Sequence, residues 1–198
     1  MTDTIKSIIE AESQAILNIP ITDAYECAVA LIVEQIHTKG GKLVISGMGK
    51  AGQIGANMAT TFSSTGTPAI FLHPSEAQHG DLGVIQRNDL MLLISNSGKT
   101  AEIIDLIALA KRLNPELKFI VITSNEDSIL AEQADIFLHT GNAAEVCPLG
   151  LTPTTSTTVM TVIGDLLVVN TMQAIGFTKE KYALRHHGGY LGVQSRKK

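Results

Sequence analysis

The sequence has few charged residues, two cysteines and no apolar stretch of membrane-spanning length. Charged residues make up 17% of its 198 residues and the formal net charge is −4, which argues against nucleic-acid binding. Cys27 and Cys147 lack the spacing of a metal site, so a reduced, cytoplasmic setting is the simplest expectation. Asp3, Lys6 and Glu10 interrupt the N-terminal stretch, so we expect no signal peptide there. Neither a membrane nor a nucleic acid is expected as a partner.

Two nucleotide-binding motifs are incomplete. The run Gly98–Thr100 reads Gly-Lys-Thr but lacks the earlier glycine of a Walker loop, so a nucleoside triphosphate is not indicated. The spacing Gly47, Gly49, Gly52 follows a predicted strand, as in dinucleotide-binding proteins. The acidic ribose partner expected at the end of the next strand is missing, however, because His73 stands there. We therefore reject NAD, expect no cofactor, and interpret the glycines as letting the backbone approach a ligand closely.

Short apolar runs alternate with helical patterns along the chain. The predicted strands are Lys42–Ser46, Ala69–Leu72, Leu90–Ile94, Lys118–Thr123 and Ile136–His139. Helices are predicted over 3–17, from Thr22 or Asp23 to Gly40, and over Gln53–Phe62, the stretch after Thr100, Ser128–Ala134, Thr154–Ile175 and Lys179–Leu184. This alternation predicts a three-layer αβα, doubly wound α/β fold with a five-stranded parallel sheet in the flavodoxin-like order 2-1-3-4-5. Its crevice would open at the carboxyl ends of strands 1 and 3.

No internal repeat or low-complexity linker divides the chain, so residues 1–198 are expected to form a single domain. Residues 1–40 would hold the N-terminal helices, and 42–192 the α/β core with a C-terminal active-site segment. Residues 193–198 would be a polar tail, with 194–198 frayed. The two N-terminal helices exceed what a minimal sheet needs. Either they pack on the sheet or they form an interface with another chain.

One stretch combines a buried strand with a polar turn and a helix start. Leu90–Ile94 is unbroken in its apolar character, which is typical of a strand buried on both faces. Ser95, Asn96, Ser97 and Thr100 follow, next to Lys99 and a predicted helix N-terminus. Unpaired N–H groups and the helix dipole favour an anion there. We interpret the stretch as a cradle for one phosphate of a small molecule; the alternative is a serine-capped helix with a solvated turn.

Three further groups of residues are candidates for chemistry. Lys50 lies in the turn after the first strand, where it is either a ligand contact or an ordinary surface lysine. His73 and His79 belong to a polar loop that faces a substrate, binds a metal, or is only internally hydrogen-bonded; we favour the substrate, with His79 as an acid–base or hydroxyl contact. Glu145 stands alone in a proline-containing loop, where a shifted pKa would suit a base, although an exposed glutamate is the alternative.

Five motifs occur in a characteristic order. They are SGMGKAGQIG (46–55), HPSEAQHGDLG (73–83), ISNSGKTAEI (94–103), AEVCPLGLTPTTSTT (144–158) and LRHHGGYLG (184–192). Together they cover most of the chain, and the sequence resembles the SIS (sugar isomerase) domain family, closely the D-arabinose 5-phosphate isomerases. Two features depart from that family: His187 stands where many members have proline, and the CBS domain pair of many members is absent. Regulation through such a pair is therefore not expected.

The resemblance implies an enzyme that interconverts D-ribulose 5-phosphate and D-arabinose 5-phosphate through a cis-enediol and supplies Kdo for lipopolysaccharide. It also implies a homotetramer with sites completed across subunits, and no metal. Two alternatives stay open. One is another SIS isomerase acting on a heptose or hexulose phosphate, and the other is a sugar-phosphate sensor without turnover. A panel of sugar phosphates would separate them.

The positions that match the family's catalytic residues are Lys50, Glu102, Glu145 and His186. We assign Glu145 as the base for the carbon-bound proton, Lys50 as the partner of the enediolate oxygen, and His186 as the group that opens the ring or moves protons between oxygens. Glu102 orients Lys50 or shares the base role. Substrate contacts are expected from Ser46, Gly47, Gly49, Thr67, His73, His79, Ser95, Asn96, Ser97 and Thr100.

Overall fold

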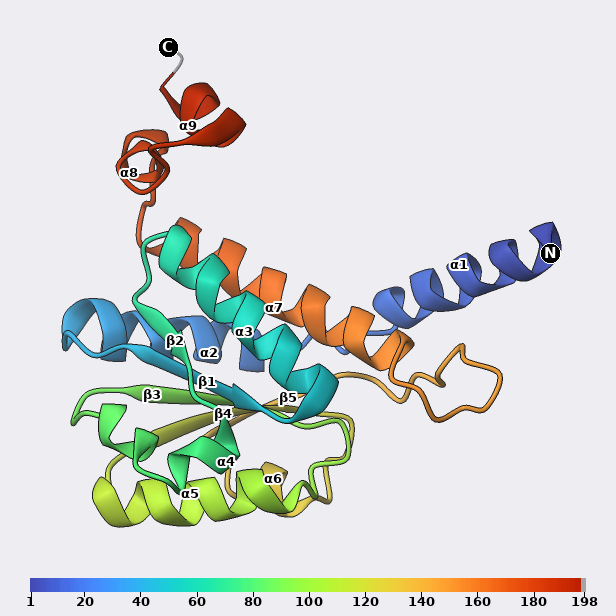
Figure 1. Cartoon of the computed structure of the whole chain (residues 1–198), viewed down its shortest axis with the longest axis horizontal. Helices are drawn as coiled ribbons and strands as arrows, with labels where there is room; N and C mark the ends of the chain where they lie inside the picture. The colour runs from blue at the N-terminus through green and yellow to red at the C-terminus, as the bar shows by residue number, and fades with distance from the viewer. Residues whose placement is uncertain (197–198) are drawn as a thin grey trace.

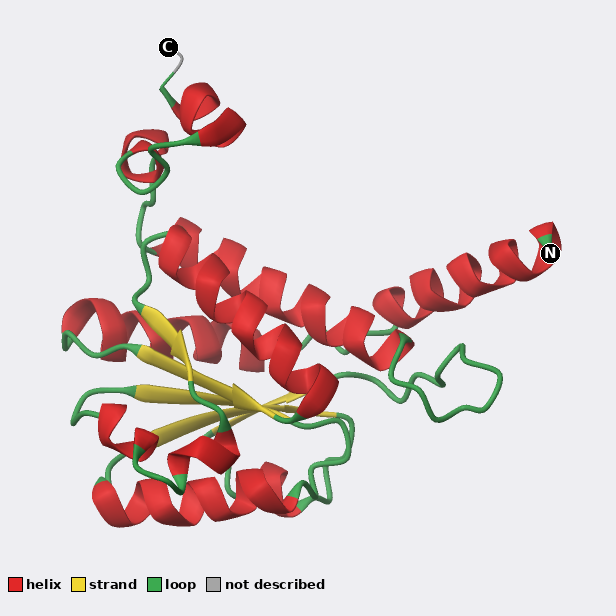
Figure 2. Cartoon of the chain, in the orientation of Figure 1, coloured by secondary structure: helices red, strands yellow, loops and turns green. Residues whose placement is uncertain are grey.

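The computed structural model describes residues 1–196 and centres on a parallel sheet (Figures 1 and 2). Within those residues the sheet has five strands in the order β2-β1-β3-β4-β5, so the order expected from the sequence is confirmed. The strands are β1 (Leu43–Gly47), β2 (Ala69–Phe71), β3 (Leu90–Ile94), β4 (Lys118–Thr123) and β5 (Ile136–His139). β3 lies at the centre and pairs in parallel with β1 and β4. Every residue of β3 is fully buried, which explains its unbroken apolar sequence.

Helices cover both faces of the sheet, so the predicted three-layer architecture is confirmed (Figure 1). One face carries α2 (Ala24–Ile32), α3 (Gly49–Ser64) and α7 (Thr155–Ala174). The other carries α4 (Pro74–Ala77), α5 (Ala101–Leu113) and α6 (Ile129–Glu132). Alternate residues of a strand belong to two separate hydrophobic cores, because successive side chains of a strand point to opposite faces of the sheet. In β3, for example, Leu92 joins the α3–α7 core and Leu93 joins the α5 core.

The two N-terminal helices differ in how they pack on the rest of the chain. α2 packs on α7 and β5, and it continues into a π-helical stretch, η1 (Val33–Thr38). α1 (Thr2–Leu17) projects away from the body (Figure 1). Its C-terminal half is anchored on α7 by buried Ala15 and by a 3.0 Å hydrogen bond from the Thr158 hydroxyl to Glu12 Oε2. Residues 1–11 are exposed, so the N-terminal half of α1 does not pack on the rest of the chain.

Three local features differ from the sequence expectations. α3 begins at Gly49 rather than Gln53, so its first turn takes in Lys50. The loop 73–83 holds α4 and the short 3₁₀-helix η2 (Asp81–Val84). After α8 (Lys179–Ala183), a further helix, α9 (Gly189–Ser195), reaches into the segment expected to fray. Gly189, with φ +67°, allows the turn into this helix. Lys197 and Lys198 lie outside the described residues.

Within residues 1–196 no helix combines the length and the apolar character needed to cross a membrane. The longest, α7, carries polar residues such as Asp165 and Asn170 among its apolar ones. Its buried apolar residues, such as Ile163 and Leu167, belong to the core that α7 forms with α3 and the sheet, whereas Leu166 and Val169 are exposed.

Candidate active site

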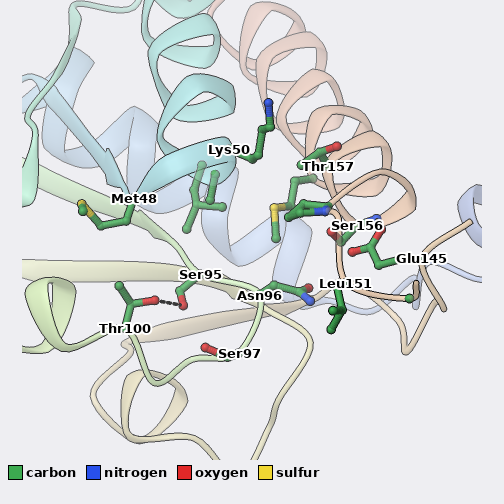
Figure 3. Close-up of a pocket in the computed structure, with 15 residues that line it drawn as sticks. Met48, Lys50, Ser95, Asn96, Ser97, Thr100, Glu145, Leu151, Ser156 and Thr157 are labelled. Carbon is green, nitrogen blue, oxygen red and sulfur yellow. Dashed lines mark hydrogen bonds between the residues drawn. The ribbon is translucent and has the colours of Figure 1, made fainter. Parts of the chain in front are cut away.

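A cavity of about 370 Å³ opens beside the carboxyl ends of β1 and β3 (Figure 3). The connections that follow these two neighbouring strands run on opposite faces of the sheet. Doubly wound folds bind ligands in the crevice at such a switch point. The cavity brings together Lys50 from α3, the turn after β3, and Glu145 from the loop 141–153. The first turn of α7 forms a further wall with Ser156 and Thr157. The volume suits a small metabolite.

The turn after β3 is held closed by its own side chains. The hydroxyl oxygens of Ser95 and Thr100 are 2.7 Å apart, and the Gly98 N–H donates to Ser95 Oγ at 3.2 Å. Ser97 Oγ accepts the Lys99 N–H at 3.2 Å and is exposed toward the cavity. Because α5 begins at Ala101, the first N–H groups of that helix lie at the same end of the cavity. The turn thus offers hydroxyls and backbone donors for an anion.

Two further contacts fix this turn in place. The Asn96 carbonyl accepts hydrogen bonds from the hydroxyls of Thr123, at 3.0 Å, and Ser124, at 2.8 Å, at the end of β4. Gly98 has φ +64°, and a Cβ atom built there would lie 2.1 Å from Ser128 Oγ. Glycine is therefore required at this position by both conformation and space.

The glycine-rich turn after β1 serves internal packing. A Cβ atom on Gly52 would lie 2.6 Å from the Gly47 carbonyl oxygen, so the two glycines let α3 begin directly against the strand end. Ser46 is buried, and its hydroxyl donates to the Leu72 carbonyl at 2.7 Å, which ties β1 to the end of β2. Gly49 has φ +56° and open space around its Cα. Of this turn, Met48, Lys50 and Ala51 line the cavity.

Lys50 is exposed and extends from the first turn of α3 (Figure 3). In this view its ammonium group points away from Ser95, Ser97 and Glu145. The positive charge is thus separated from the hydroxyl-rich turn after β3.

Glu145 forms a cap on the N-terminus of α7. Its Oε2 atom accepts the Thr154 N–H at 2.7 Å, the Thr154 hydroxyl at 2.9 Å and the Ser156 N–H at 3.3 Å. Burial raises the pKa of this carboxyl, but the bonds from Ser156 and Thr154 together outweigh it, so the net pKa lies below the ordinary value. Glu145 is therefore ionised at neutral pH and oriented at the cavity wall.

Four more of the predicted site residues lie outside the cavity wall. Thr67 lies just before β2, at the amino-terminal end of that strand, whereas the cavity lies at the carboxyl ends of β1 and β3. Its hydroxyl is 3.1 Å from His37 Nε2. His73 follows β2, with its Nδ1 atom buried and unpartnered within the described part of the chain. His79 is exposed between α4 and η2. Glu102 is in the first turn of α5, beside the cradle but not part of the cavity lining.

His186 lies far from the cavity of its own chain. It follows α8, its ring stacks on Tyr182 with centroids 3.7 Å apart, and its Nδ1 atom is 3.1 Å from the Tyr182 carbonyl. The cavity is at the N-terminal end of α7, whereas α8 and α9 follow its C-terminal end (Figure 1). Twenty helical residues separate the two ends by about 30 Å. Within one chain His186 is thus not brought to Lys50 and Glu145.

Several cavity residues were not singled out from the sequence. Ser156 and Thr157 belong to the run Thr154–Thr158, and such a run of hydroxyl residues before an apolar helix is a recognisable N-terminal signal. Cys147 lies in the same loop as Glu145, and its sulfur accepts the N–H groups of Thr152 and Leu151 at 3.1 and 3.2 Å. Chiefly the bond from Thr152 lowers the pKa of this thiol to about 7. No group of three or more potential metal ligands occurs within residues 1–196.

A hydroxyl-lined cavity at the switch point of a doubly wound sheet is the arrangement of α/β proteins that bind small phosphorylated molecules. The sequence of this chain also matches a known protein family. The SIS domain model matches residues 35–170, and the chain belongs to the SIS domain family. The resemblance carried by the five motifs is thereby confirmed.

Curated relatives are named arabinose 5-phosphate isomerase KdsD. The protein of Shigella flexneri is 51% identical over 162 residues, which are 82% of this chain and 49% of the relative. The protein of Francisella tularensis is 44% identical over 184 residues, 93% of this chain and 55% of the relative. The chain thus spans about half the length of the curated relatives it matches.

Two solved structures match almost end to end. A protein of Bacteroides fragilis, described as a candidate phosphosugar isomerase involved in capsule formation, is 69% identical with a TM-score of 0.95, covering 96% of this chain and 99% of its own. A protein of Escherichia coli CFT073, solved in complex with arabinose 5-phosphate, is 36% identical with a TM-score of 0.82, covering 92% of this chain and 95% of its own.

Proposed function

We propose that this chain is an aldose–ketose isomerase that interconverts D-ribulose 5-phosphate and D-arabinose 5-phosphate through a cis-enediol. The observation that carries the proposal is that one cavity is lined by the hydroxyl-rich turn after β3, by Lys50 and by the ionised carboxylate of Glu145. The names of the curated relatives and the arabinose 5-phosphate bound to the Escherichia coli protein support this substrate pair.

The turn after β3 would bind the substrate phosphate. Ser97 and Thr100 offer hydroxyl groups, and the start of α5 offers backbone N–H groups and the positive end of its dipole. A phosphate held there would direct the sugar chain toward Lys50 and Glu145 on the other side of the cavity. This division of labour fixes the reacting carbons with respect to the carboxylate.

The proton transfer needs a base, a cation and a route between two oxygens. From the aldose, Glu145 would remove the proton on C2 while the C1 carbonyl oxygen becomes the enediolate oxygen, stabilised by Lys50. Glu145 would then return the proton to C1 as the O2 hydroxyl loses its proton and becomes the ketone. His186 would open the sugar ring or move protons between O1 and O2. Glu102, next to the cradle, would orient Lys50 or share the base role.

We further propose a homotetramer with active sites shared between chains. Two apolar surfaces support an assembly: α1 exposes Ile5, Ile8 and Ile9, at 54%, 40% and 60%, on a helix that projects from the body. A largely apolar groove of about 910 Å³ runs between α2 and α7, past Val29 and Leu166. Surfaces of this kind mark contacts with other chains. A second copy would cover them and carry its own C-terminal segment toward a neighbouring cavity.

The place of the reaction in the cell is part of the same proposal. The name KdsD carried by the relatives supports a role in supplying Kdo for lipopolysaccharide. We also propose a cytoplasmic setting. The capsule-related description of the Bacteroides fragilis protein fits synthesis of another surface polysaccharide from the same sugar.

The deciding experiment is turnover of ribulose 5-phosphate by the purified chain in D₂O, followed by NMR. We expect arabinose 5-phosphate with deuterium at C2, because an enediol mechanism exposes the transferred proton to solvent exchange. A Glu145→Gln variant is the control for a contaminating isomerase. Turnover of a heptose or hexulose phosphate instead would contradict the substrate, and calorimetric binding with no turnover of any sugar phosphate would indicate a sensor.

A further inference from the structure

The helix cap on α7 is built in an unusual way. Thr154 is the N-cap residue, a position where a threonine hydroxyl commonly accepts an N–H of its own helix. Here the Thr154 side chain makes no such bond. Its hydroxyl lies 2.9 Å from Glu145 Oε2, and that carboxylate accepts the helix N–H groups in its place.

The hydroxyl proton of Thr154 lies between two acceptors. Glu145 Oε2 is 2.9 Å away, and the Thr152 carbonyl oxygen is 3.3 Å away. A charged acceptor at the shorter distance forms the stronger bond, so the single proton belongs to the carboxylate. The bonds from Thr154 and from the Ser156 N–H all end on Oε2, so Oε1 takes part in none of these three bonds. The Ser156 side chain is a further donor to the carboxyl.

Thr154 reaches the cavity only through Glu145. Glu145, Pro153 and Ser156 line the cavity wall, whereas Thr154 does not. The loop that carries Glu145 has no regular secondary structure from Thr140 to Pro153, so its position depends on ties to α7. One tie is the Val146 N–H to Thr155 Oγ1, at 3.2 Å, which holds the backbone. The Thr154 hydroxyl, at 2.9 Å, is a side-chain tie that holds the carboxylate from the cap position, and the Ser156 side chain is a second donor to it.

We propose that Thr154 is a positioning residue for the reaction: its hydroxyl holds Glu145 Oε2 on the end of α7 so that Oε1 faces the substrate carbon. This inference rests on the proposed isomerase function and on Glu145 as its base. The hydroxyl donates to the charged form of Glu145 and therefore also stabilises the carboxylate over the carboxylic acid. Loss of the hydroxyl would leave the carboxylate held by the N–H groups of Thr154 and Ser156 and by the Ser156 side chain, so it would be held less firmly and would protonate at higher pH.

The effect of the Thr154 hydroxyl on the protonation of Glu145 has to be distinguished from the effects of other titratable groups nearby. Lys50 faces the same cavity from α3, and Cys147, two residues along the loop, has a pKa lowered to about 7. Glu12 of α1 approaches α7 one turn further on, at Thr158. The Cys147→Ser background removes the thiol titration, with a pKa of about 7, from the neutral part of the pH profile, while Lys50 and Glu12 are unchanged in every variant compared.

The test compares Thr154→Val, which removes the hydroxyl but keeps the shape and the N–H, with Thr154→Ser, which keeps the hydroxyl. Thr161→Val is the matched control, because that hydroxyl on α7 bonds to the Thr157 carbonyl of its own helix, at 2.9 Å. Each variant is followed in two ways: the pH profile of kcat and KM for ribulose 5-phosphate, and ¹³C NMR titration of the Glu145 carboxyl, assigned with Glu145→Gln. Thermal unfolding checks the fold, and Thr154→Ala substitutes for a valine variant that does not fold.

We expect Thr154→Val to lower kcat about tenfold with little change in KM, and to move the Glu145 titration and the acid limb of kcat upward by about one pH unit. Thr154→Ser and Thr161→Val should behave like the parent protein. An unmoved Glu145 titration in Thr154→Val would overturn the inference while an inactive Glu145→Gln still left the proposed function standing. An active Glu145→Gln would instead overturn the assignment of Glu145 as the base, and this inference with it.

Discussion

The hydroxyl oxygens of Ser95 and Thr100 lie 2.7 Å apart across the turn after β3. The contact joins the end of the central strand to the N-cap of α5, and the Gly98 N–H adds a second bond to Ser95 Oγ. The turn is therefore held in shape by its own side chains, without a bound ligand. A preorganised site loses less conformational entropy on binding, which favours affinity for a small ligand.

Replacing Ser97 by alanine should weaken binding of the sugar phosphate. A hydrogen bond to a charged group contributes about 1.5–3 kcal/mol, so we expect the Kd to rise roughly tenfold to a hundredfold. Isothermal calorimetry with arabinose 5-phosphate measures this directly. Ser64→Ala is the matched control, because the Ser64 hydroxyl bonds to the Thr61 carbonyl near the other end of α3. Equal affinities of the Ser97 variant and the control would contradict the cradle.

Replacing Gly98 by alanine should destabilise the protein. The left-handed backbone, with φ +64°, costs about 1–2 kcal/mol for a non-glycine residue. The crowding against Ser128, where the new Cβ would lie 2.1 Å from Oγ, adds about 1–3 kcal/mol. Gly40→Ala is the control, because Gly40 has φ +76° but open space, and it isolates the backbone cost. Urea unfolding should therefore give a clearly larger loss for Gly98→Ala, and equal losses would show that the turn yields to the side chain.

Removing the charge of Lys50 should reduce turnover and leave the fold intact. Lys50 is exposed on the first turn of α3, so Lys50→Ala and the length-matched Lys50→Met should unfold at nearly the parent temperature. If the ammonium stabilises the enediolate, kcat should fall by about 10²–10³-fold in both, with a smaller change in KM. A near-parent kcat in Lys50→Met would assign the residue a structural or purely surface role.

The distance between His186 and the cavity of its own chain predicts an active site shared between subunits. Lys50→Ala and His186→Ala chains, each expected to have little activity alone, are mixed in equal amounts, unfolded and refolded together. If His186 acts on a neighbouring chain, about a quarter of the sites in a random mixture receive both intact residues, and activity returns in that proportion. Refolding each variant alone is the control. Mixed oligomers of the right size with no activity would place both residues in one chain or remove His186 from the site.

Local sequence patterns were sufficient to predict the strands of the sheet and their order. β3 and β4 were predicted at the bounds that the structure shows, because an unbroken apolar run such as Leu90–Ile94 is stable only when both faces are buried. The strand order followed from strand–helix alternation and crossover handedness, and it placed the turns after β1 and β3 together. The helix α9 was missed because a seven-residue helix that begins at Gly189 has little periodicity.

The sequence by itself determined the strands, the doubly wound order and the hydroxyl-rich turn at Ser95–Thr100, because burial and turn chemistry act over a few neighbouring residues. Only the tertiary structure decided the state of Glu145: a loop glutamate could have a raised or a lowered pKa, and its contacts with Ser156 and Thr154 lower it. It also showed that Gly47 and Gly52 pack α3 against β1, and that His186 lies at the far end of α7 from the cavity. These properties depend on which residues meet across folded elements, and that pairing is set by packing of the whole chain rather than by local pattern.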